Sequence, residues 1–273
     1  MNQNLKEKVK DHWEDETCGT RYKSNNDIVS IIRDTENARY KLEPEILEFG
    51  EFQNFKGKTI LEIGVGGGVD HLNWYKAGAI PFGIDLTEAA IDLATKRLNF
   101  HGIDPKGRLK TGDAENLEFE DDTFDLVYSW GVLHHTPDTE NAFFETFRVL
   151  KPGGQLKAMI YHIPSWTGWM LWVRHGLLKG NPFLSPRVAI YKYLESPGTK
   201  AYTLEETEKM LSACGFKKIS LKTKLGPGDL LTIRQSKRYE GLIYKLIWKF
   251  YPRWLVRLSG DRFGLGLLIE ASK

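Results

Sequence analysis

Short apolar runs alternate with amphipathic stretches between residues 58 and 161, which is typical of a parallel sheet whose strands are joined by helices. The apolar runs predict five strands, at 58–63, 79–85, 108–111, 124–129 and 155–162. The intervening stretches predict helices over 69–77, after the N-cap residue Thr87, and over 139–150. The pattern therefore predicts an α/β fold with a mostly parallel sheet.

The second half of the chain adds a helix and two strands to this plan. Thr203 and Glu206 form a capping-box pattern at the start of a helix that should end at Gly215, and strands are expected at 216–223 and 266–271. Two further segments, 163–202 and 224–264, do not fit the alternation and are expected to be insertions. Both would leave the sheet at the carboxyl ends of its strands, where open α/β sheets bind ligands.

The first predicted strand runs into a glycine-rich loop, Gly64 to Gly68, directly after Glu62. Glycines let the backbone approach a nucleotide-like ligand and adopt positive φ without strain. The dinucleotide fingerprint needs a glycine three residues after Gly66, where this chain has Val69, so NAD and FAD are disfavoured. No Lys followed by Ser or Thr ends the loop, so a P-loop is excluded.

Acidic residues follow the next two predicted strands. Asp85 lies about twenty residues after the glycine loop, where a carboxylate can accept hydrogen bonds from both ribose hydroxyls of an adenosyl ligand. Asp113 lies in the loop after the third strand, where its carboxylate can accept a hydrogen bond from the adenine amino group. The segment 124–135 and the Pro-Gly-Gly turn at 152–154 complete the set of motifs.

Taken together, these five motifs over residues 58–162 resemble the class I S-adenosylmethionine-dependent methyltransferases. Within this family the chain is most similar to the small-molecule branch that includes the ubiquinone- and menaquinone-biosynthesis enzymes. The resemblance implies a Rossmann-like, seven-stranded, mostly parallel sheet with helices on both faces and helical cap insertions. It also implies S-adenosylmethionine as cofactor, with S-adenosylhomocysteine as product.

The resemblance implies a role for each matching residue. Contacts with the cofactor are expected at Glu62, Gly64, Val65, Gly66, Asp70, Asp85, Leu86, Asp113, Ala114, Ser129 and Trp130. Asp85 would hold the ribose, with Leu86 against the adenine, and Asp113 and Ala114 would contact the adenine edge. Ser129 and Trp130 would lie beside the methionine carboxylate and the sulfonium. Asp70 replaces a small or apolar residue of the family pattern and is expected to reach the amino group, which Glu62 would face through the loop.

The N-terminal segment resembles leaders of a bacterial subgroup of these enzymes at residues 13–20 and at Arg39–Tyr40, which implies a lid over the cofactor. Cys18 within it is equally well explained as an ordinary loop residue. We therefore divide the chain into a helical lid (1–56), a cofactor-binding core (57–162), a cap insertion (163–202) and a C-terminal part of the core (203–273) that carries the second insertion at 224–264.

Methyl transfer from a sulfonium is an in-line displacement that depends mainly on alignment, and a hydroxyl or acidic carbon acceptor also needs a base. Three strand-end histidines are candidates, in the order His134, His162, His135. The competing explanation for His134 is packing within the helical segment after the fourth strand. Tyr161 and Tyr22 are further candidates.

Several acceptors and activities remain open. Enzymes that methylate exocyclic base amines usually carry Asn or Asp followed by Pro-Pro and an aromatic residue after the fourth strand, whereas this chain has Ser-Trp-Gly-Val at 129–132. Base amines are thus disfavoured, an RNA acceptor is a lesser alternative, and no sequence-specific nucleic acid partner is expected. The fold also permits a noncatalytic adenosyl-binding protein or another reaction, such as decarboxylation or cyclisation.

Composition sharpens the interpretation of the insertions. Residues 57–161 carry 10 Lys and Arg against 16 Asp and Glu, whereas residues 162–200 carry 5 against 1 and residues 226–273 carry 9 against 4. Five of the eight tryptophans lie in the two basic stretches. These stretches could form a cap alone, a cap over a lipophilic or aromatic acceptor, or a peripheral membrane contact through 163–178 and 239–258.

The remaining composition indicates an ordinary globular protein. Cys18 and Cys214 are far apart and have no metal-ligand spacing, so neither a disulfide framework nor a metal site is expected, and a reducing cytoplasm is the simplest setting. We predict no signal peptide, because the first residues lack an apolar run, and no transmembrane segment. The expected location is therefore cytoplasmic, with possible attachment to a membrane surface.

Overall fold

The computed structural model describes residues 2–15, 27–233 and 248–273. Cys18, Tyr22 and the first part, 239–247, of the stretch 239–258 for which a membrane contact was one alternative lie outside this description. A seven-stranded sheet with the order β3-β2-β1-β4-β5-β7-β6 forms its centre. The strands are β1 (Thr59–Ile63), β2 (Ile80–Asp85), β3 (Leu109–Thr111), β4 (Phe124–Trp130), β5 (Leu150–Tyr161), β6 (Lys217–Lys224) and β7 (Gly266–Ser272). Only β7 runs antiparallel to its neighbours, so the sheet is mostly parallel, as predicted.

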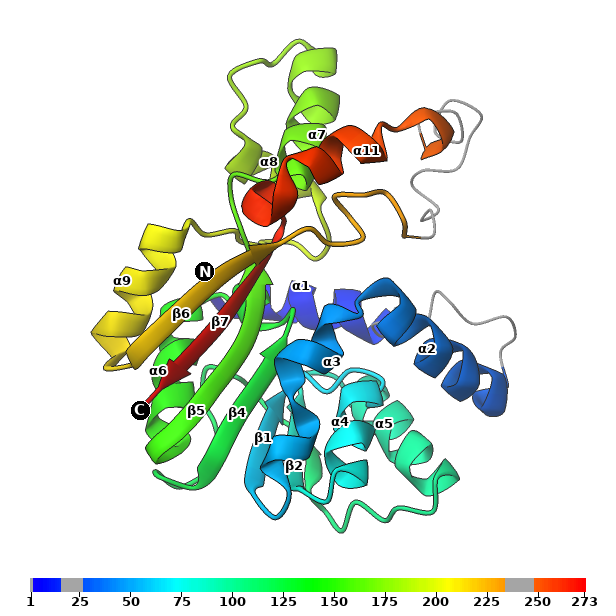
Figure 1. Cartoon of the computed structure of the whole chain (residues 1–273), viewed down its shortest axis with the longest axis vertical. Helices are drawn as coiled ribbons and strands as arrows, with labels where there is room; N and C mark the ends of the chain where they lie inside the picture. Colours follow the sequence, from blue (N-terminus) through cyan, green and yellow to red (C-terminus); the bar gives the residue numbers. More distant parts are fainter. Residues whose placement is uncertain (1, 16–26, 234–247) are drawn as a thin grey trace.

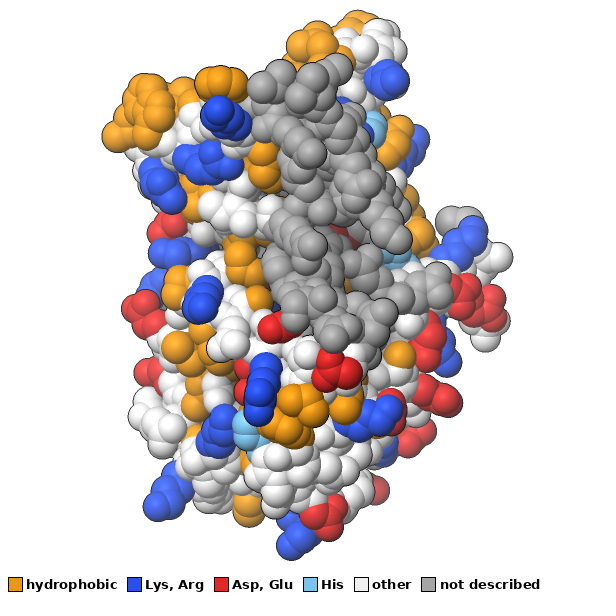
Figure 2. All heavy atoms as spheres, turned by 90° about the vertical axis from the view of Figure 1, so that its right-hand side faces the viewer, with side chains coloured by type: hydrophobic (Ala, Val, Ile, Leu, Met, Phe, Trp, Pro, Cys, Tyr) orange, Lys and Arg blue, Asp and Glu red, His pale blue; other side chains and the backbone are white. Residues whose placement is uncertain are grey.

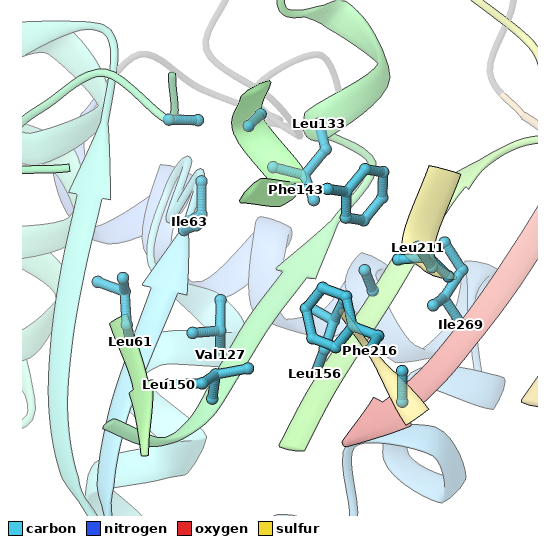
Figure 3. Packing of buried hydrophobic residues seen from close by; sticks show 14 of the residues in the cluster. Leu61, Ile63, Val127, Leu133, Phe143, Leu150, Leu156, Leu211, Phe216 and Ile269 are labelled. Carbon is cyan, nitrogen blue, oxygen red and sulfur yellow. The ribbon is translucent and has the colours of Figure 1, made fainter. Parts of the chain in front are cut away.

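Helices cover both faces of this sheet (Figure 1). In chain order the core helices are α4 (Val69–Lys76), α5 (Glu88–Phe100), α6 (Thr139–Val149) and α9 (Leu204–Cys214). Alternate strand residues face opposite layers: Ile60 packs with Trp74 of α4, whereas Leu61 packs in the cluster that includes α6 and α9. Figure 3 shows this second cluster, in which Val127, Leu156 and Ile269 of the sheet meet Phe143 and Leu211 of the helices.

Local signals in the sequence set most boundaries. Thr87 and Thr203 cap α5 and α9 with their side chains, and the capping box of Thr203 and Glu206 is fully formed. Gly215 ends α9 with a φ of 103°, which favours glycine. One boundary differs: β5 begins at Leu150 rather than at 155, because the Pro-Gly-Gly segment stays in the strand and is accommodated by a register shift against β4.

The described residues before β1 are mainly helical and form α1 (Asn2–Asp15), α2 (Ile28–Leu42), α3 (Glu45–Gly50) and the 3₁₀ helix η2 (Phe52–Phe55). Buried Arg97 of α5 joins α2 to the core. Its guanidinium donates to the Gly67 carbonyl oxygen at 2.6 Å, to Glu36 at 2.6 Å and to the Thr35 hydroxyl at 2.6 Å. The buried guanidinium of Arg97 therefore links the glycine loop to α2.

The two insertions lie beyond the carboxyl ends of β4 and β5 (Figure 1). They contain α7 (Trp166–His175), the 3₁₀ helix η4 (Leu177–Lys179), α8 (Pro186–Tyr193), α11 (Arg253–Leu258) and the 3₁₀ helix η6 (Gly260–Phe263). Trp166 donates to the Ser259 hydroxyl at 2.9 Å, and the rings of Trp169 and Phe263 lie 5.0 Å apart. The insertions thus pack against each other, and we call the pair the cap.

Asp229 fastens the cap to the sheet. Its carboxylate is fully buried and accepts hydrogen bonds from the Thr167 amide and hydroxyl, the Gly226 amide and the Leu265 amide. One side chain therefore joins the start of α7 to both ends of the second insertion. Among the helices in the described part of the chain, none combines the length and apolarity needed to cross a membrane.

Candidate functional site

A cavity of about 390 Å³ opens at the carboxyl ends of the parallel strands. Its walls come from three sources: the strand-end loops of the core, the N-terminal helices and the cap. The core contributes residues 62–67, 84–87, 112–114 and 130–132. Every predicted cofactor residue except Ser129 lines this cavity.

The glycine loop is shaped by close contacts that exclude side chains. Gly64 has a φ of 80°, and a Cβ atom placed on it would lie 2.1 Å from a methyl group of Val132. The Gly66 amide donates to Asp85 at 2.9 Å, and Thr87 donates to the other oxygen of that carboxylate from its amide at 3.0 Å and its hydroxyl at 2.8 Å. Burial raises the pKa of Asp85 above its usual value, and these hydrogen bonds offset only part of that increase. The Asp85 carboxylate is thereby fixed at the cavity wall, where it retains acceptor capacity for ligand hydroxyls.

Glu62 lies beneath the loop and pairs with a histidine that sequence reasoning missed. The Glu62 carboxyl lies 2.9 Å from Nδ1 of His71, and both side chains are buried. Burial raises the pKa of Glu62 well above its usual value, with a further increase from nearby Asp70, and burial lowers the pKa of His71 to about 3. The imidazole is therefore held in its neutral form next to the cavity floor.

Asp70 lies at the centre of a polar network that ties α2 to the core. Its carboxylate accepts from Arg39 Nη2 at 2.6 Å and Nε at 3.2 Å, and from the Tyr40 and Tyr128 hydroxyls at 2.9 and 3.2 Å. Arg39 also donates to Glu43 at 2.6 Å. The predicted contact between Asp70 and the cofactor amino group stays a prediction, and the structure gives this carboxylate a second role as the anchor of α2.

Helix α1 covers the side of the cavity on which Asp113 lies. Lys6 donates to Asp113 at 2.6 Å and to Glu115 at 2.5 Å, and Val9 and Trp13 of the same helix also line the cavity. Burial alone would lower the pKa of Lys6, but its two carboxylate partners raise it. Asp113, which is predicted to contact adenine, thus forms an ion pair with Lys6 of the N-terminal helix.

The two residues predicted at the end of the fourth strand have different surroundings. Ser129 is fully buried, donates to the Ile63 carbonyl oxygen at 3.0 Å and does not line the cavity. Trp130 lines the cavity and donates from its indole to Glu43 at 2.9 Å. Ser129 therefore holds β4 to β1, whereas Trp130 forms part of the wall.

The three candidate histidines also have different surroundings in the structure. His134 is fully buried, does not line the cavity, and burial lowers its pKa well below the usual value. His162 is buried too, and its Nδ1 lies 3.0 Å from the Gly264 carbonyl oxygen where the second insertion returns to the sheet. Only His135 lines the cavity. Of the three, the geometry therefore favours His135, which the sequence placed third.

His135 belongs to a polar cluster with residues from the first insertion. Its Nδ1 lies 2.8 Å from the Ser196 hydroxyl and 3.1 Å from the Thr199 hydroxyl, and its Nε2 lies 3.5 Å from the Glu195 carboxylate. Tyr161 donates to the same Glu195 oxygen at 2.8 Å. Tyr161 was a candidate in the sequence, whereas no motif marked Glu195, because it comes from the cap and meets β5 only in the folded chain.

The sheet order, the glycine loop and the strand-end acids together define the core as a class I S-adenosylmethionine-dependent methyltransferase domain. A cradle that admits no Cβ at Gly64, with a fixed carboxylate opposite, fits the adenosyl and methionine parts of that cofactor. More particularly, residues 61–158 match the family described as a methyltransferase domain.

Curated relatives agree with this assignment over part of their length. The chain is 31% identical over 152 residues to a demethylmenaquinone methyltransferase from Lactobacillus johnsonii, covering 54% of this chain and 62% of the relative. It is 41% identical over 102 residues to a phthiotriol/phenolphthiotriol dimycocerosates methyltransferase from Mycobacterium ulcerans, covering 37% and 36%. With Phosphoethanolamine N-methyltransferase 2 from Caenorhabditis elegans it shares 37% over 117 residues, covering 42% and 26%. The chain therefore spans less than two thirds of these relatives.

Solved structures share the fold at low sequence identity. The methyltransferase in a complex with the Haloferax volcanii Trm112 methyltransferase activator is 17% identical, with a TM-score of 0.62 over 97% of this chain and 96% of that one. The [4+2]-cyclase SpnF is 16% identical, with a TM-score of 0.54 over 100% of this chain and 94% of that one. The same fold thus carries different reactions, and the reaction has to be argued from the site.

Proposed function

We propose that the chain transfers a methyl group from S-adenosylmethionine to a small, apolar or aromatic biosynthetic metabolite. The observation that carries this proposal is the continuation of the cavity beyond the glycine loop into a region walled by the cap. This region has mainly apolar walls, formed by Leu42, Met159, Leu194, Pro227, Ile233, Leu265 and Leu268. A lipophilic acceptor would gain from burial there, and Tyr161, Glu195 and Lys224 on the cavity walls could bind a polar group that it carries.

The names of two relatives support this acceptor class. One is a demethylmenaquinone methyltransferase and another acts on phthiotriol or phenolphthiotriol dimycocerosates, so both names specify lipophilic acceptors. The family match covers residues 61–158 of the core, however, and the cap of this chain would select its own member of the class.

We further propose that His135 is the general base. Thr199 donates its hydroxyl hydrogen to the Ser196 carbonyl oxygen at 2.7 Å, so its oxygen accepts from His135 and fixes the hydrogen on Nδ1. The lone pair would then lie on Nε2, a buried atom without a hydrogen-bond partner in the described part of the chain. The Glu195 carboxylate at 3.5 Å from Nε2 would stabilise the imidazolium formed when an acceptor hydroxyl or acidic carbon loses its proton.

In this proposal the bound cofactor supplies an electrophilic methyl group, and the protein supplies alignment and the base. The glycine loop and Asp85 would hold the donor, and the cap would press the acceptor against it, which removes the entropy cost of bringing the two together. Tyr161, fixed by its hydrogen bond to Glu195, would orient a polar group on an otherwise apolar acceptor.

Binding comes first in the test: calorimetry should give micromolar binding of S-adenosylmethionine and S-adenosylhomocysteine and none of NAD. A panel of a demethylated quinol, a phenolic lipid, phosphoethanolamine and RNA is then incubated with the cofactor, and S-adenosylhomocysteine and methylated product are measured. Product from the quinol or phenol alone supports the proposal. Product from phosphoethanolamine or RNA alone would refute the acceptor class, and acceptor conversion without S-adenosylhomocysteine would indicate another reaction.

Two variants separate the roles of donor and base. His135→Gln should leave the Kd for S-adenosylmethionine within about twofold and lower kcat by about 10²- to 10⁴-fold, the usual contribution of a general base. Asp85→Ala should raise the Kd instead. Unchanged kcat in His135→Gln would refute the assignment of the base, and unchanged Kd in Asp85→Ala would refute the ribose assignment.

A further inference from the structure

The cap exposes large hydrophobic side chains to an unusual degree. Most of the large hydrophobic residues that are exposed in the described part of the chain belong to the two insertions. The most exposed are Phe183 at 97%, Leu178 at 75%, Leu258 at 73%, Phe250 at 72% and Trp254 at 67%. Single exposed hydrophobic residues are ordinary, but a gathering of large ones marks an interaction surface.

Exposed cations accompany these side chains. Lys179, Lys192, Lys249 and Arg257 are exposed in the same two insertions. Of the acidic residues in the described part of the insertions, Asp229 is fully buried and Glu195 lines the cavity, which leaves Asp261 at the surface. The outer side of the cap is therefore apolar and positively charged.

The exposed residues belong to one packed unit, because the insertions are joined by the Trp166–Ser259 hydrogen bond and the Trp169–Phe263 ring contact. Figure 1 places α7, α8 and α11 together at the end of the molecule beyond the sheet, and Figure 2 shows orange and blue side chains mixed at this end. The same unit walls the apolar region of the cavity. We call the exposed surface of this unit, which includes the exposed side chains of Leu178, Phe183, Trp254 and Leu258, the cap face.

We propose that the cap face docks on an anionic lipid bilayer. Large apolar side chains interspersed with Lys and Arg match the interfacial zone of such a bilayer, where apolar groups enter the acyl boundary and cations meet lipid phosphates. A second copy of the chain fits less well, because two cap faces would bring positive charges together. Docking would also bring the cap wall of the cavity to the membrane. This part of the inference rests on the proposed lipophilic acceptor, which would then enter from the lipid phase.

Vesicle co-sedimentation of the full chain tests the proposal. The vesicles are pure phosphatidylcholine or a mixture with phosphatidylglycerol, at low and at high salt. The chain should bind the mixed vesicles at least tenfold more tightly than the neutral ones, and high salt should weaken the binding. The variants Leu178→Ser/Phe183→Ser and Trp254→Ser/Leu258→Ser should each lose at least tenfold in affinity. Phe144→Ser is the matched control, because Phe144 is 52% exposed on α6 of the core.

Two further measurements keep this proposal separable from the proposed function. Calorimetric binding of S-adenosylhomocysteine should be unchanged in both double variants, which shows that they fold and isolates docking from the cofactor site. Absence of binding to the mixed vesicles at low salt, or equal binding by the wild type and both double variants, would overturn the proposal. So would a dimer in solution that both double variants dissolve, because the cap face would then be a protein interface.

Discussion

The contact between Arg39 and Asp70 offers a direct test of how the N-terminal helices are held over the cofactor cavity. Arg39 makes three charge-assisted hydrogen bonds, two to Asp70 and one to Glu43, and Asp70 is only 4% exposed. Removing one partner of a buried pair costs about 3–5 kcal/mol. Because the Arg39 side chain is 20% exposed, we expect Arg39→Met to lower the free energy of unfolding by the smaller figure of about 3 kcal/mol.

A double-mutant cycle isolates the pair. Asp70→Asn alone should cost a similar amount, since it leaves the guanidinium facing a neutral amide. The double variant should cost about 4 kcal/mol rather than the sum of about 6 kcal/mol, which gives a coupling energy of about 2 kcal/mol. Urea denaturation measures all three, with Arg33→Met, an exposed position on the same helix, as a control expected within about 0.5 kcal/mol. A coupling below about 0.5 kcal/mol would refute the reasoning, because that is the value of an exposed ion pair.

The same variants decide between the two roles of Asp70. If Asp70 acts only as the anchor of α2, both single variants should weaken S-adenosylhomocysteine binding equally. If it also contacts the amino group of the ligand, Asp70→Asn should weaken binding by a further factor of about ten, equivalent to one charge-assisted hydrogen bond. Calorimetric titration of both variants gives this comparison.

Three other substitutions test the core and the cap. Burial lowers the pKa of His134 in the folded chain, so the free energy of unfolding of the wild type should fall by about 1.4 kcal/mol per pH unit below about pH 6.5. His134→Phe should remove this contribution, and denaturation at pH 7 and pH 5 measures the difference. Gly64→Ala should abolish cofactor binding and destabilise the chain by about 3 kcal/mol through its clash with Val132, whereas Gly102→Ala, with similar φ and open space, should cost about 1–2 kcal/mol. Asp229→Ala should leave its donors unpaired and cost about 4 kcal/mol, seen as proteolysis in the cap before the core.

The sequence predicted the core well because its signals are local. An apolar run that ends in Glu62 and a glycine loop, or a capping box at Thr203, specifies the backbone within a few residues, and parallel strands then bring their carboxyl ends to one edge. This is why Asp85 and Asp113, distant in sequence, could be placed in one site before the fold was known. The start of β5 was misplaced because Pro-Gly-Gly is an equally strong signal for a turn.

The acceptor side escaped prediction because it depends on contacts between distant segments. Nothing near Glu195 marks it as functional, yet the first insertion brings it to Tyr161 and His135. Asp229 likewise can be identified as a structural anchor only in the folded chain, where donors from three segments bind its carboxylate. The sequence could not show which of His134 and His135 faces the cavity, because a difference of one residue after a strand decides it. The 3₁₀ helix η3 (Leu133–His135) fixes which of the two side chains does so.

The division of the cavity between core and cap has a consequence for how the activity should respond to change. In our proposal the core loops and the N-terminal helices bind the donor, whereas Leu194, Glu195, Pro227 and Ile233 of the cavity walls come from the insertions, which are tied to the sheet through Asp229. Substitutions in the cap should therefore alter acceptor selection while leaving the affinity for S-adenosylmethionine unchanged. The same fold also serves a cyclase, so the fold alone does not fix the acceptor, and we expect exchange of the two insertions to alter it.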